Sequence, residues 1–395
     1  MIGKEHFAAR PEDVGIETEK LEAVFARAER DIQQGILPAA QVAVARNGLI
    51  AGMRSFGSAV HGDRKKVVSD ESLFCIFSCT KAVVAAAVWT LFEDGRLRLD
   101  EKVADIIPEF ATNGKDVVTV EQLMLHTGGF PYAPFPPRDW GNREALLEAF
   151  SRWRLTFEPG SKFEYHATSA HWVLSEIIHR RAGQDFRTYI RERITEPMGL
   201  PELFVGLPED QIGRYALVEW VGEETPPPGG WGEVTPEAIR NFSNPRRAAS
   251  GIPGGGGVTS AAELAMFYQV LLNGGETRSG ARVLKPETIE FATKVRTRPD
   301  HRDPSFGNTA NRGLSIIIAG DDGDAFKRGF GRVASPTAFG HGGAGGQIAW
   351  GDPETGISVG YVTNGFTDWM TSGRRVVAIS SLAAGCATAS LAVTT

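Results

Sequence analysis

The sequence has few cysteines, no excess of basic residues and no hydrophobic run long enough to cross a membrane. Its three cysteines among 395 residues, Cys75, Cys79 and Cys386, do not suggest a disulfide framework. The formal net charge of −6 offers no basic surface for nucleic acid. The first residues, MIGKEHFAARPEDVGIETEK, contain no apolar segment typical of a secretory signal. These absences predict a cytoplasmic globular protein that binds neither nucleic acid nor membranes.

Hydrophobic spacing predicts helices and strands in a definite order along the chain. A helix is expected over 17–35, followed by two strands over 39–57 that turn at the Asn-Gly pair 47–48. A further helix after Ser78 has few polar faces and should lie in the core. Two strands are expected around the turn at 352–356, and a helix closes the chain.

The predicted strands occur early and late in the chain, and the middle of the chain reads as helices joined by Pro- and Gly-rich loops. We therefore expect an α+β protein in which one antiparallel sheet combines the N-terminal hairpin with the C-terminal strands. Residues 1–100 and 250–395 would form this sheet lobe, with flanking helices, and residues 101–249 a mostly helical lobe. The active site is expected in the cleft between the two lobes.

Ser78 and Lys81 are the first candidates for chemistry. Residues three apart on a helix share a face, so the lysine can reach the serine hydroxyl. Burial disfavours a charged ammonium, which would allow Lys81 to act as a base on Ser78. A helix N-terminus also offers a free backbone N–H to developing negative charge. The alternative is a serine cap followed by a lysine that extends to solvent, since one such spacing is expected by chance in a chain of this size.

Two later segments favour the catalytic interpretation. Tyr165 lies between a turn and a predicted helix, and a phenol beside an ammonium can transfer a proton to a leaving group. The run HGGAGG at 341–346 opens a predicted strand, where glycines allow close approach to the backbone and free N–H groups. Either segment could instead be structural, as a half-buried tyrosine or as a flexible loop.

With these three segments in order, the chain resembles the serine β-lactamase and penicillin-binding-protein superfamily. It is most similar to the class C-type branch that contains the family VIII carboxylesterases. The segments LMLHTGGFPY (123–132), GGGGVTSAAELAMFYQVLLNGG (254–275) and GDPETGISVGYVTNG (351–365) support the resemblance. It extends from about residue 12 to about residue 385, and it implies a β-lactamase-like fold.

The resemblance also implies a role for each matching residue. Ser78 would be the acylated nucleophile, Lys81 would activate it, and Tyr165 would be the partner base and acid. The backbone N–H groups of Ser78 and Ala344 would form the oxyanion hole. His341 would lie on the strand edge facing the substrate. The remaining candidates for substrate contact are Gly342, Gly343, Tyr132, Trp231 and Trp350.

Two departures from the branch bear on the substrate. β-Lactamases of this branch usually have asparagine where this chain has Ala167, and commonly Lys-Thr-Gly where it has His341, Gly342 and Gly343. Both changes remove polar groups that hold a β-lactam or peptide, but neither removes the acylation residues. We therefore expect a carboxylesterase that acts on a small-molecule ester through an acyl-enzyme.

Other functions on the same scaffold stay open from the sequence. They are a β-lactamase or D-amino-acid peptidase, an amide hydrolase, an acyltransferase and, least favoured, a binding protein without catalysis. The spacing of His166 and His171 does not match the helical zinc motif, so no metal and no cofactor are expected. The sequence leaves the oligomeric state open.

Overall fold

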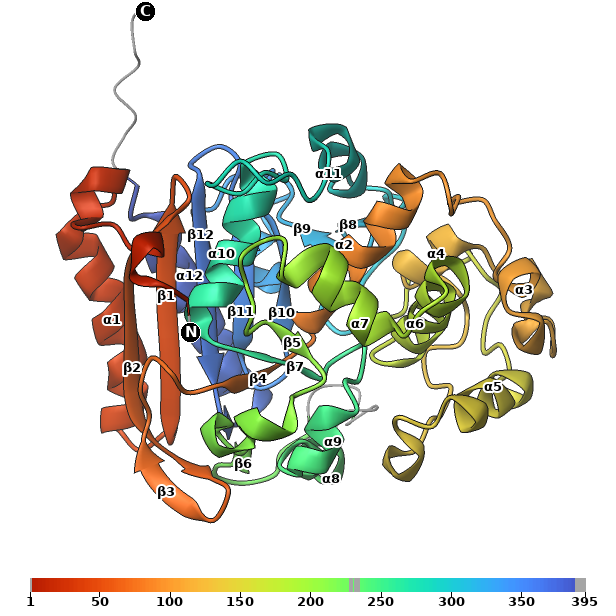
Figure 1. Ribbon diagram of the computed structural model, residues 1–395, viewed down its shortest axis with the longest axis horizontal. Coiled ribbons are helices and arrows are strands. Elements are labelled where there is room, and N and C mark those ends of the chain that lie inside the picture. Colours follow the sequence, from red (N-terminus) through yellow and green to blue (C-terminus); the bar gives the residue numbers. More distant parts are fainter. Residues whose placement is uncertain (1, 227–229, 231–234, 388–395) are drawn as a thin grey trace, which may run out of the picture.

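An eight-stranded sheet forms the centre of the protein in the computed structural model, which describes residues 2–226, 230 and 235–387. Every neighbouring pair in this sheet is antiparallel (Figure 1). In spatial order the strands are β3 (Arg64–Val67), β2 (Leu49–His61), β1 (Ala39–Arg46), β12 (Ile357–Thr363), β11 (Gln347–Gly351), β10 (Phe339–Gly343), β9 (Ile316–Ile318) and β8 (Arg312–Gly313). The pairing of β1 with β12 confirms the predicted union of N-terminal and C-terminal strands.

The turn between β1 and β2 forms where the Asn-Gly pair predicted it. Asn47 has φ of 54° and Gly48 has φ of 73°, which is the positive-φ pair that a two-residue hairpin turn of type I′ requires. Arg46 pairs directly with Leu49 across this turn. The hairpin register, and with it the face on which each β1 side chain lies, is therefore set locally.

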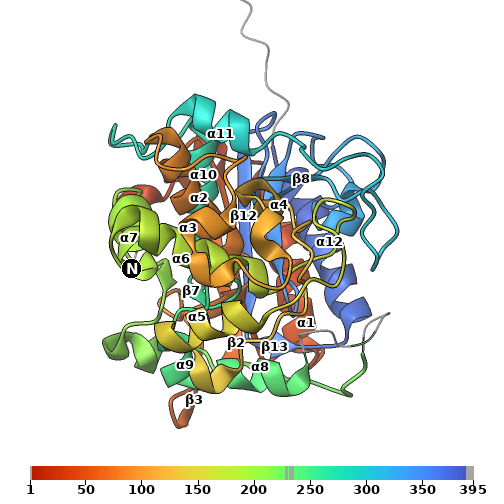
Figure 2. The same ribbon diagram turned by 90° about the vertical axis from the view of Figure 1, so that its right-hand side faces the viewer.

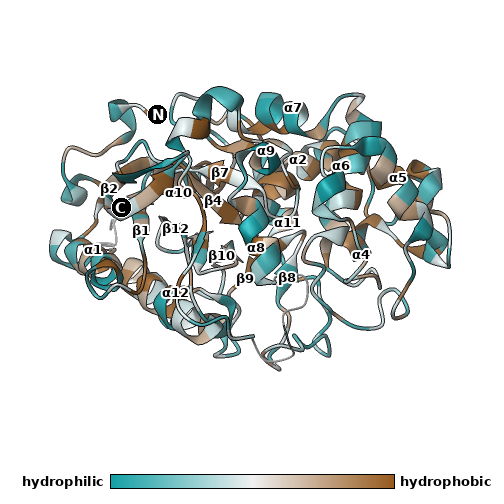
Figure 3. Ribbon diagram, turned by 90° about the horizontal axis from the view of Figure 1, so that it is seen from below, coloured by the Kyte–Doolittle hydropathy of each residue, from teal (hydrophilic) through white to brown (hydrophobic). Residues whose placement is uncertain are grey.

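Alternation along β1 divides the core into two layers. Ala39, Ala43 and Ala45 belong to one buried cluster, whereas Val42 and Val44 belong to another on the opposite face of the sheet. Helices α1 and α12 pack on the second face, and α10 packs on the first. In Figure 1, α1 lies at the left of the sheet and α2 and α10 lie at its right. Figure 3 shows hydrophobic residues along α2.

Twelve α-helices surround the sheets in the part of the chain that the structure describes. They are α1 (Thr18–Gln33), α2 (Thr80–Glu93), α3 (Val103–Ile106), α4 (Val120–Met124), α5 (Arg143–Arg152), α6 (Ser169–Ala182), α7 (Phe186–Ile190), α8 (Pro236–Phe242), α9 (Pro245–Ala249), α10 (Ala261–Leu272), α11 (Pro286–Ala292) and α12 (Trp369–Ala384). The fold is thus the α+β arrangement predicted from the sequence, with one antiparallel sheet and flanking helices. No helix among the described residues is both long and apolar enough to pass through a bilayer.

Helices α3 to α6 gather on the side away from α1, and Figure 2 shows them in front. The middle segment also contributes strands to two small sheets. One consists of β4 (Phe74–Phe77), β7 (Gly257–Thr259) and β5 (Phe204–Val205), and the other of β13 (Gly365–Phe366) and β6 (Glu219–Trp220). The larger buried cluster runs from the sheet into these helices without interruption. The division at residues 100 and 250 stays a prediction.

Candidate active site

The N-terminus of α2 holds Ser78 at the junction of a strand and a helix. Phe77, the last residue of β4, has φ of 44°, in the left-handed region that a non-glycine residue adopts only at a cost. This conformation turns the chain sharply from β4 into α2. The side chain of Ser78 stays partly exposed, whereas residues Thr80 to Leu91 of α2 are buried.

Lys81 is fully buried, and its Nζ has three hydrogen-bond acceptors. It donates to Ser78 Oγ at 3.1 Å, to the carbonyl oxygen of Ala167 at 2.7 Å and to that of Gly254 at 2.5 Å. The two carbonyls come from segments far from α2 in the sequence. They hold the amine beside the hydroxyl, so the predicted proximity of Ser78 and Lys81 is observed.

Tyr165 meets Lys81 from the loop that precedes α6. The Lys81 Nζ lies 5.0 Å from the centre of the Tyr165 ring. That ring also lies 4.7 Å from the His126 ring and 6.2 Å from the His341 ring, measured between ring centres. The fold therefore brings Ser78, Lys81 and Tyr165 together from separate parts of the chain.

The end of β10 forms the opposite wall of the site. β9 pairs with β10 only at Phe339 and Gly340, so His341 and the two glycines after it have no strand on that edge. A Cβ at Gly343 would lie 2.5 Å from the carbonyl oxygen of Ile76, which only glycine avoids. This close approach places the turn after β10 against the residues that lead to Ser78.

Two backbone N–H groups remain available at this contact. In the part of the chain that the structure describes, neither Ser78 N nor Ala344 N donates a hydrogen bond to a protein acceptor. Ala344 follows β10 directly and packs against the cluster that contains Phe77. An oxyanion hole consists of such backbone N–H donors, so these two groups meet its chemical requirement.

His341 is buried and uncharged in this setting. Its Nδ1 lies 2.7 Å from the carbonyl oxygen of Gly342, which can only accept, so Nδ1 carries the ring proton. Burial, together with the positive charges of Arg312 and Lys81, lowers the pKa of His341 well below its usual value. The ring thus supplies no positive charge where the resemblance would place a lysine.

Comparison with known proteins agrees with this geometry. The sequence profile of the family described as Beta-lactamase matches residues 24–381. The chain belongs to the Beta-lactamase family. It is therefore a serine hydrolase of the β-lactamase fold, as the resemblance predicted.

One curated relative and two solved structures are similar to this Beta-lactamase-family chain over most of its length. It is 28% identical to the esterase/β-lactamase LipL of Mycobacterium tuberculosis over 322 residues, which cover 75% of this chain and 70% of LipL. A penicillin-binding-protein homologue from Caulobacter crescentus superposes with a TM-score of 0.79 and 29% identity, over 93% of this chain and 98% of that one. A family VIII carboxylesterase superposes with a TM-score of 0.76 and 25% identity, over 93% and 98%.

The aromatic residues proposed as substrate contacts in this Beta-lactamase-family chain have different outcomes. The prediction that Trp350 contacts substrate is wrong. Its side chain is fully buried and faces α12, and its indole N–H donates to Ser380 Oγ at 3.1 Å. It cannot line a substrate pocket. Tyr132 is 55% exposed beside the carboxylate of Glu164, and its contact with substrate stays a prediction. Trp231 lies outside the described residues.

Arg312 is the residue of this site that sequence reasoning missed. It lies on β8, is 8% exposed, and its guanidinium carbon stands 5.5 Å from the centre of the Tyr165 ring. A signal was present in the sequence, since a charged residue precedes the apolar run GLSIII at 313–318. Periodicity alone could not show that this residue faces Tyr165.

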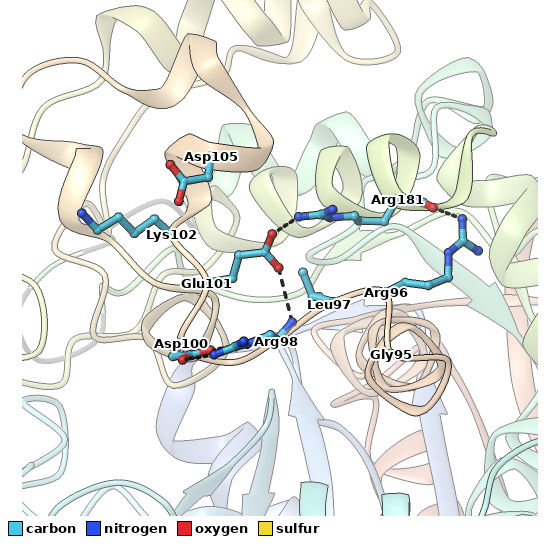
Figure 4. Close-up of a pocket in the computed structure, with 9 residues that line it drawn as sticks. All are labelled: Gly95, Arg96, Leu97, Arg98, Asp100, Glu101, Lys102, Asp105 and Arg181. Carbon is cyan, nitrogen blue, oxygen red and sulfur yellow. Dashed lines mark hydrogen bonds and ion pairs between the residues drawn. The ribbon is translucent and has the colours of Figure 1, made fainter.

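A pocket of about 530 Å³ lies at the opposite end of α2 from Ser78 (Figure 4). Its wall consists of Gly95, Arg96, Leu97, Arg98, Asp100, Glu101, Lys102, Asp105 and Arg181. Arg98 pairs with Asp100, and Arg181 pairs with Glu101. It holds none of the residues that surround Ser78, so we assign no catalytic role to it.

Proposed function

We propose that the protein hydrolyses small uncharged carboxylic esters through an acyl-enzyme on Ser78. Ser78 Oγ attacks the ester carbonyl carbon while Lys81 and Tyr165, acting as a unit, take the hydroxyl proton. The N–H groups of Ser78 and Ala344 stabilise the oxyanion. The alcohol leaves with the proton, and water then hydrolyses the acyl-enzyme by the reverse transfer. The hydrogen bond between Lys81 Nζ and Ser78 Oγ carries this proposal.

The three acceptors around Lys81 suit a group that exchanges a proton with Ser78. A neutral amine has two N–H donors and one lone pair. The carbonyl oxygens of Ala167 and Gly254 can only accept, so they occupy the two donors. The lone pair then points at Ser78 Oγ, which is the direction needed to receive the hydroxyl proton. The charged amine fits the same three acceptors, so proton transfer requires little movement of the side chain.

The preference for esters over β-lactams rests on the third segment of the site. The carboxylate of a β-lactam antibiotic would meet His341, whose ring is neutral, and Gly342, which has no side-chain donor. A charged hydrogen bond contributes about 1.5–3 kcal/mol, so its loss costs roughly ten- to a hundredfold in binding. Ala167 removes a further side-chain amide. An uncharged ester does not need these contacts.

The test compares kcat/KM for a short-chain p-nitrophenyl ester with kcat/KM for nitrocefin and for a penicillin. We expect the ester to be preferred by at least roughly tenfold, with Ser78→Ala inactive on all three. Equal turnover of a β-lactam would contradict the ester assignment. A short-chain alcohol added to the same assay distinguishes acyl transfer, because a new ester then accumulates in place of acid.

Gly342→Thr is the matched variant for the same question. A Cβ at Gly342 would have no neighbour closer than 3.7 Å, so the threonine side chain can begin without a clash. The added hydroxyl should raise the ratio of nitrocefin to ester turnover by a few-fold. An unchanged ratio in the folded variant would show that this position does not meet the substrate.

A further inference from the structure

Arg312 is a buried cation that has no carboxylate partner among the described residues and lies against two aromatic rings. Its side chain makes no ion pair and donates no hydrogen bond to any residue that the structure describes, and one terminal nitrogen is fully covered. The guanidinium carbon lies 5.2 Å from the centre of the Phe163 ring and 5.5 Å from that of the Tyr165 ring. A buried charge is costly unless an opposite charge or hydrogen bonds compensate it. The surroundings of Arg312 must therefore offer compensation of some kind.

Besides Arg312, the titratable groups that lie against the Tyr165 ring among the described residues are Lys81 and two histidines. Lys81 approaches the ring from α2, and the neutral rings of His126 and His341 approach from the loop after α4 and from β10. Burial and the charge of Arg312 lower the pKa of both histidines well below the usual value. Neither histidine can therefore balance or replace a charge here.

The charged groups around Arg312 itself are Asp303 and Arg328. Asp303 makes no ion pair with Arg312, and its negative charge only raises the pKa of Arg312 from a distance. Arg328 is a cation already paired with Asp322. Burial lowers the pKa of Arg312, and the charge of an ionised Tyr165 opposes that shift. The phenol of Tyr165 is thus the ionisable acid best placed to carry the compensating negative charge.

We propose that Arg312 is a positioning residue that stabilises the phenolate form of Tyr165. The inference rests on the proposed function. As the bond from Ser78 Oγ to the acyl carbon forms, Lys81 Nζ receives the hydroxyl proton and passes one of its own protons to the phenolate oxygen. As the bond from that carbon to the alcohol oxygen breaks, the phenol returns the proton to the alcohol. Arg312 keeps its own charge throughout and holds Tyr165 ready for both transfers.

This assignment accounts for the uncharged third segment of the site. In the Lys-Thr-Gly pattern a lysine stands on the strand that here carries His341. In this chain β10 supplies no cation, and Arg312 supplies one from β8, on the far side of β9. A positive charge thus stands beside Tyr165, whereas the surface that a substrate carboxylate would meet is neutral. A cation beside the tyrosine together with a neutral substrate surface suits a proton relay that acts on uncharged esters.

A spectroscopic titration tests the charge effect without any turnover. Phenolate absorbance is followed against pH in Ser78→Ala, and the signal of Tyr165 is assigned by its loss in Ser78→Ala with Tyr165→Phe. Adding Arg312→Met should move this titration to higher pH by about 1–3 units, the range expected when an opposite charge at this distance is removed. Arg312→Lys should restore most of the original position. An unmoved titration in folded Arg312→Met would overturn the proposal.

The second test is the pH profile of ester kcat/KM. Arg312→Met should move the acidic limb of the profile upward and lower the rate near pH 7 by about ten- to a hundredfold, with recovery at high pH. The matched control is Arg296→Met, which removes a neighbouring cation that is paired with Glu121. A uniform loss at every pH would show a merely structural role and would sink the proposal. If no ester is hydrolysed but the titration moves, the substrate assignment fails and the electrostatic one stands.

Discussion

Among the described residues two lysines are fully buried and have the same kinds of hydrogen-bond acceptor, and one of them lies outside the candidate site. Lys81 and Lys115 both have no exposed surface. Lys115 Nζ donates to Thr112 Oγ1 at 3.0 Å, and that threonine precedes it by three residues, as Ser78 precedes Lys81. It also donates to the carbonyl oxygens of Thr112 and Trp153, at 2.7 and 2.6 Å. A hydroxyl three residues before a buried lysine is therefore not by itself a catalytic pair.

The difference lies in what surrounds each hydroxyl. Thr112 Oγ1 donates its proton to the carbonyl oxygen of Ser151 at 2.7 Å, so that proton is committed to a structural hydrogen bond. Ser78 Oγ has no hydrogen-bond partner other than Lys81 among the described residues. The ring beside Lys115 is Phe110, at 5.2 Å, and it has no hydroxyl to relay a proton. A free hydroxyl proton, a phenol and open N–H groups distinguish the site.

The comparison is tested most strongly by removing the two hydroxyls. Ser78→Ala should reduce ester turnover by roughly 10⁴- to 10⁶-fold with the fold intact, because it removes the nucleophile of a coupled unit. Thr112→Val, its matched control, should keep kcat/KM within a few-fold of the parent. The measurement is steady-state hydrolysis, with circular dichroism to confirm folding. Near-normal hydrolysis by folded Ser78→Ala would remove Ser78 from the mechanism.

The next largest effect is expected from the relay partners. Lys81→Met and Tyr165→Phe should each lose about 10²- to 10⁴-fold in acylation rate. The double variant should be little worse than the poorer single one, because both residues act on the same proton. Lys115→Met is the control and should acylate like the parent. The rate is measured with an activated ester in single turnover, and fully additive losses would argue against a shared relay.

A smaller effect concerns stability and belongs to Lys115. Burial, with the charge of Arg154, lowers the pKa of Lys115 from 10.5 to about 8. Between these values the unfolded chain holds a proton that the folded chain has released, so the unfolding free energy should rise with pH. The slope is at most about 1.4 kcal/mol per pH unit. Urea unfolding across this window should show a rise in the parent that Lys115→Met lacks, and identical curves would refute the assignment.

Local sequence signals predicted much of the fold. The Asn-Gly pair predicted the first hairpin, and amphipathic or wholly apolar spacing predicted α1 and the position of α2. The short strands β8 and β9 were not predicted, since two or three residues show no usable alternation. Their place at the sheet edge depends on pairing with β10, which is a property of the folded chain.

The residues of the site were predictable where a motif marks them and not elsewhere. Ser78, Lys81 and Tyr165 come together as expected, although their roles stay predictions. Trp350 was wrong because the alternation of β11 was not applied: Ile348 and Trp350 share the face toward α12, and Ala349 faces the other way. For Arg312 and Lys115 the local sequence does not show which groups each side chain faces, because only tertiary contacts distinguish their environments.

The rate at which the Cys79 thiol reacts can serve as a measure of how often the candidate site opens. Cys79 is buried at the start of α2, and its Sγ donates to the carbonyl oxygen of His341 at 3.0 Å. Burial raises the pKa of this thiol, so a thiol reagent cannot react until β10 separates from α2. The labelling rate of Cys79 therefore reports how often these two elements part. An acylated protein, if it holds them together more firmly, would be labelled more slowly than the free one.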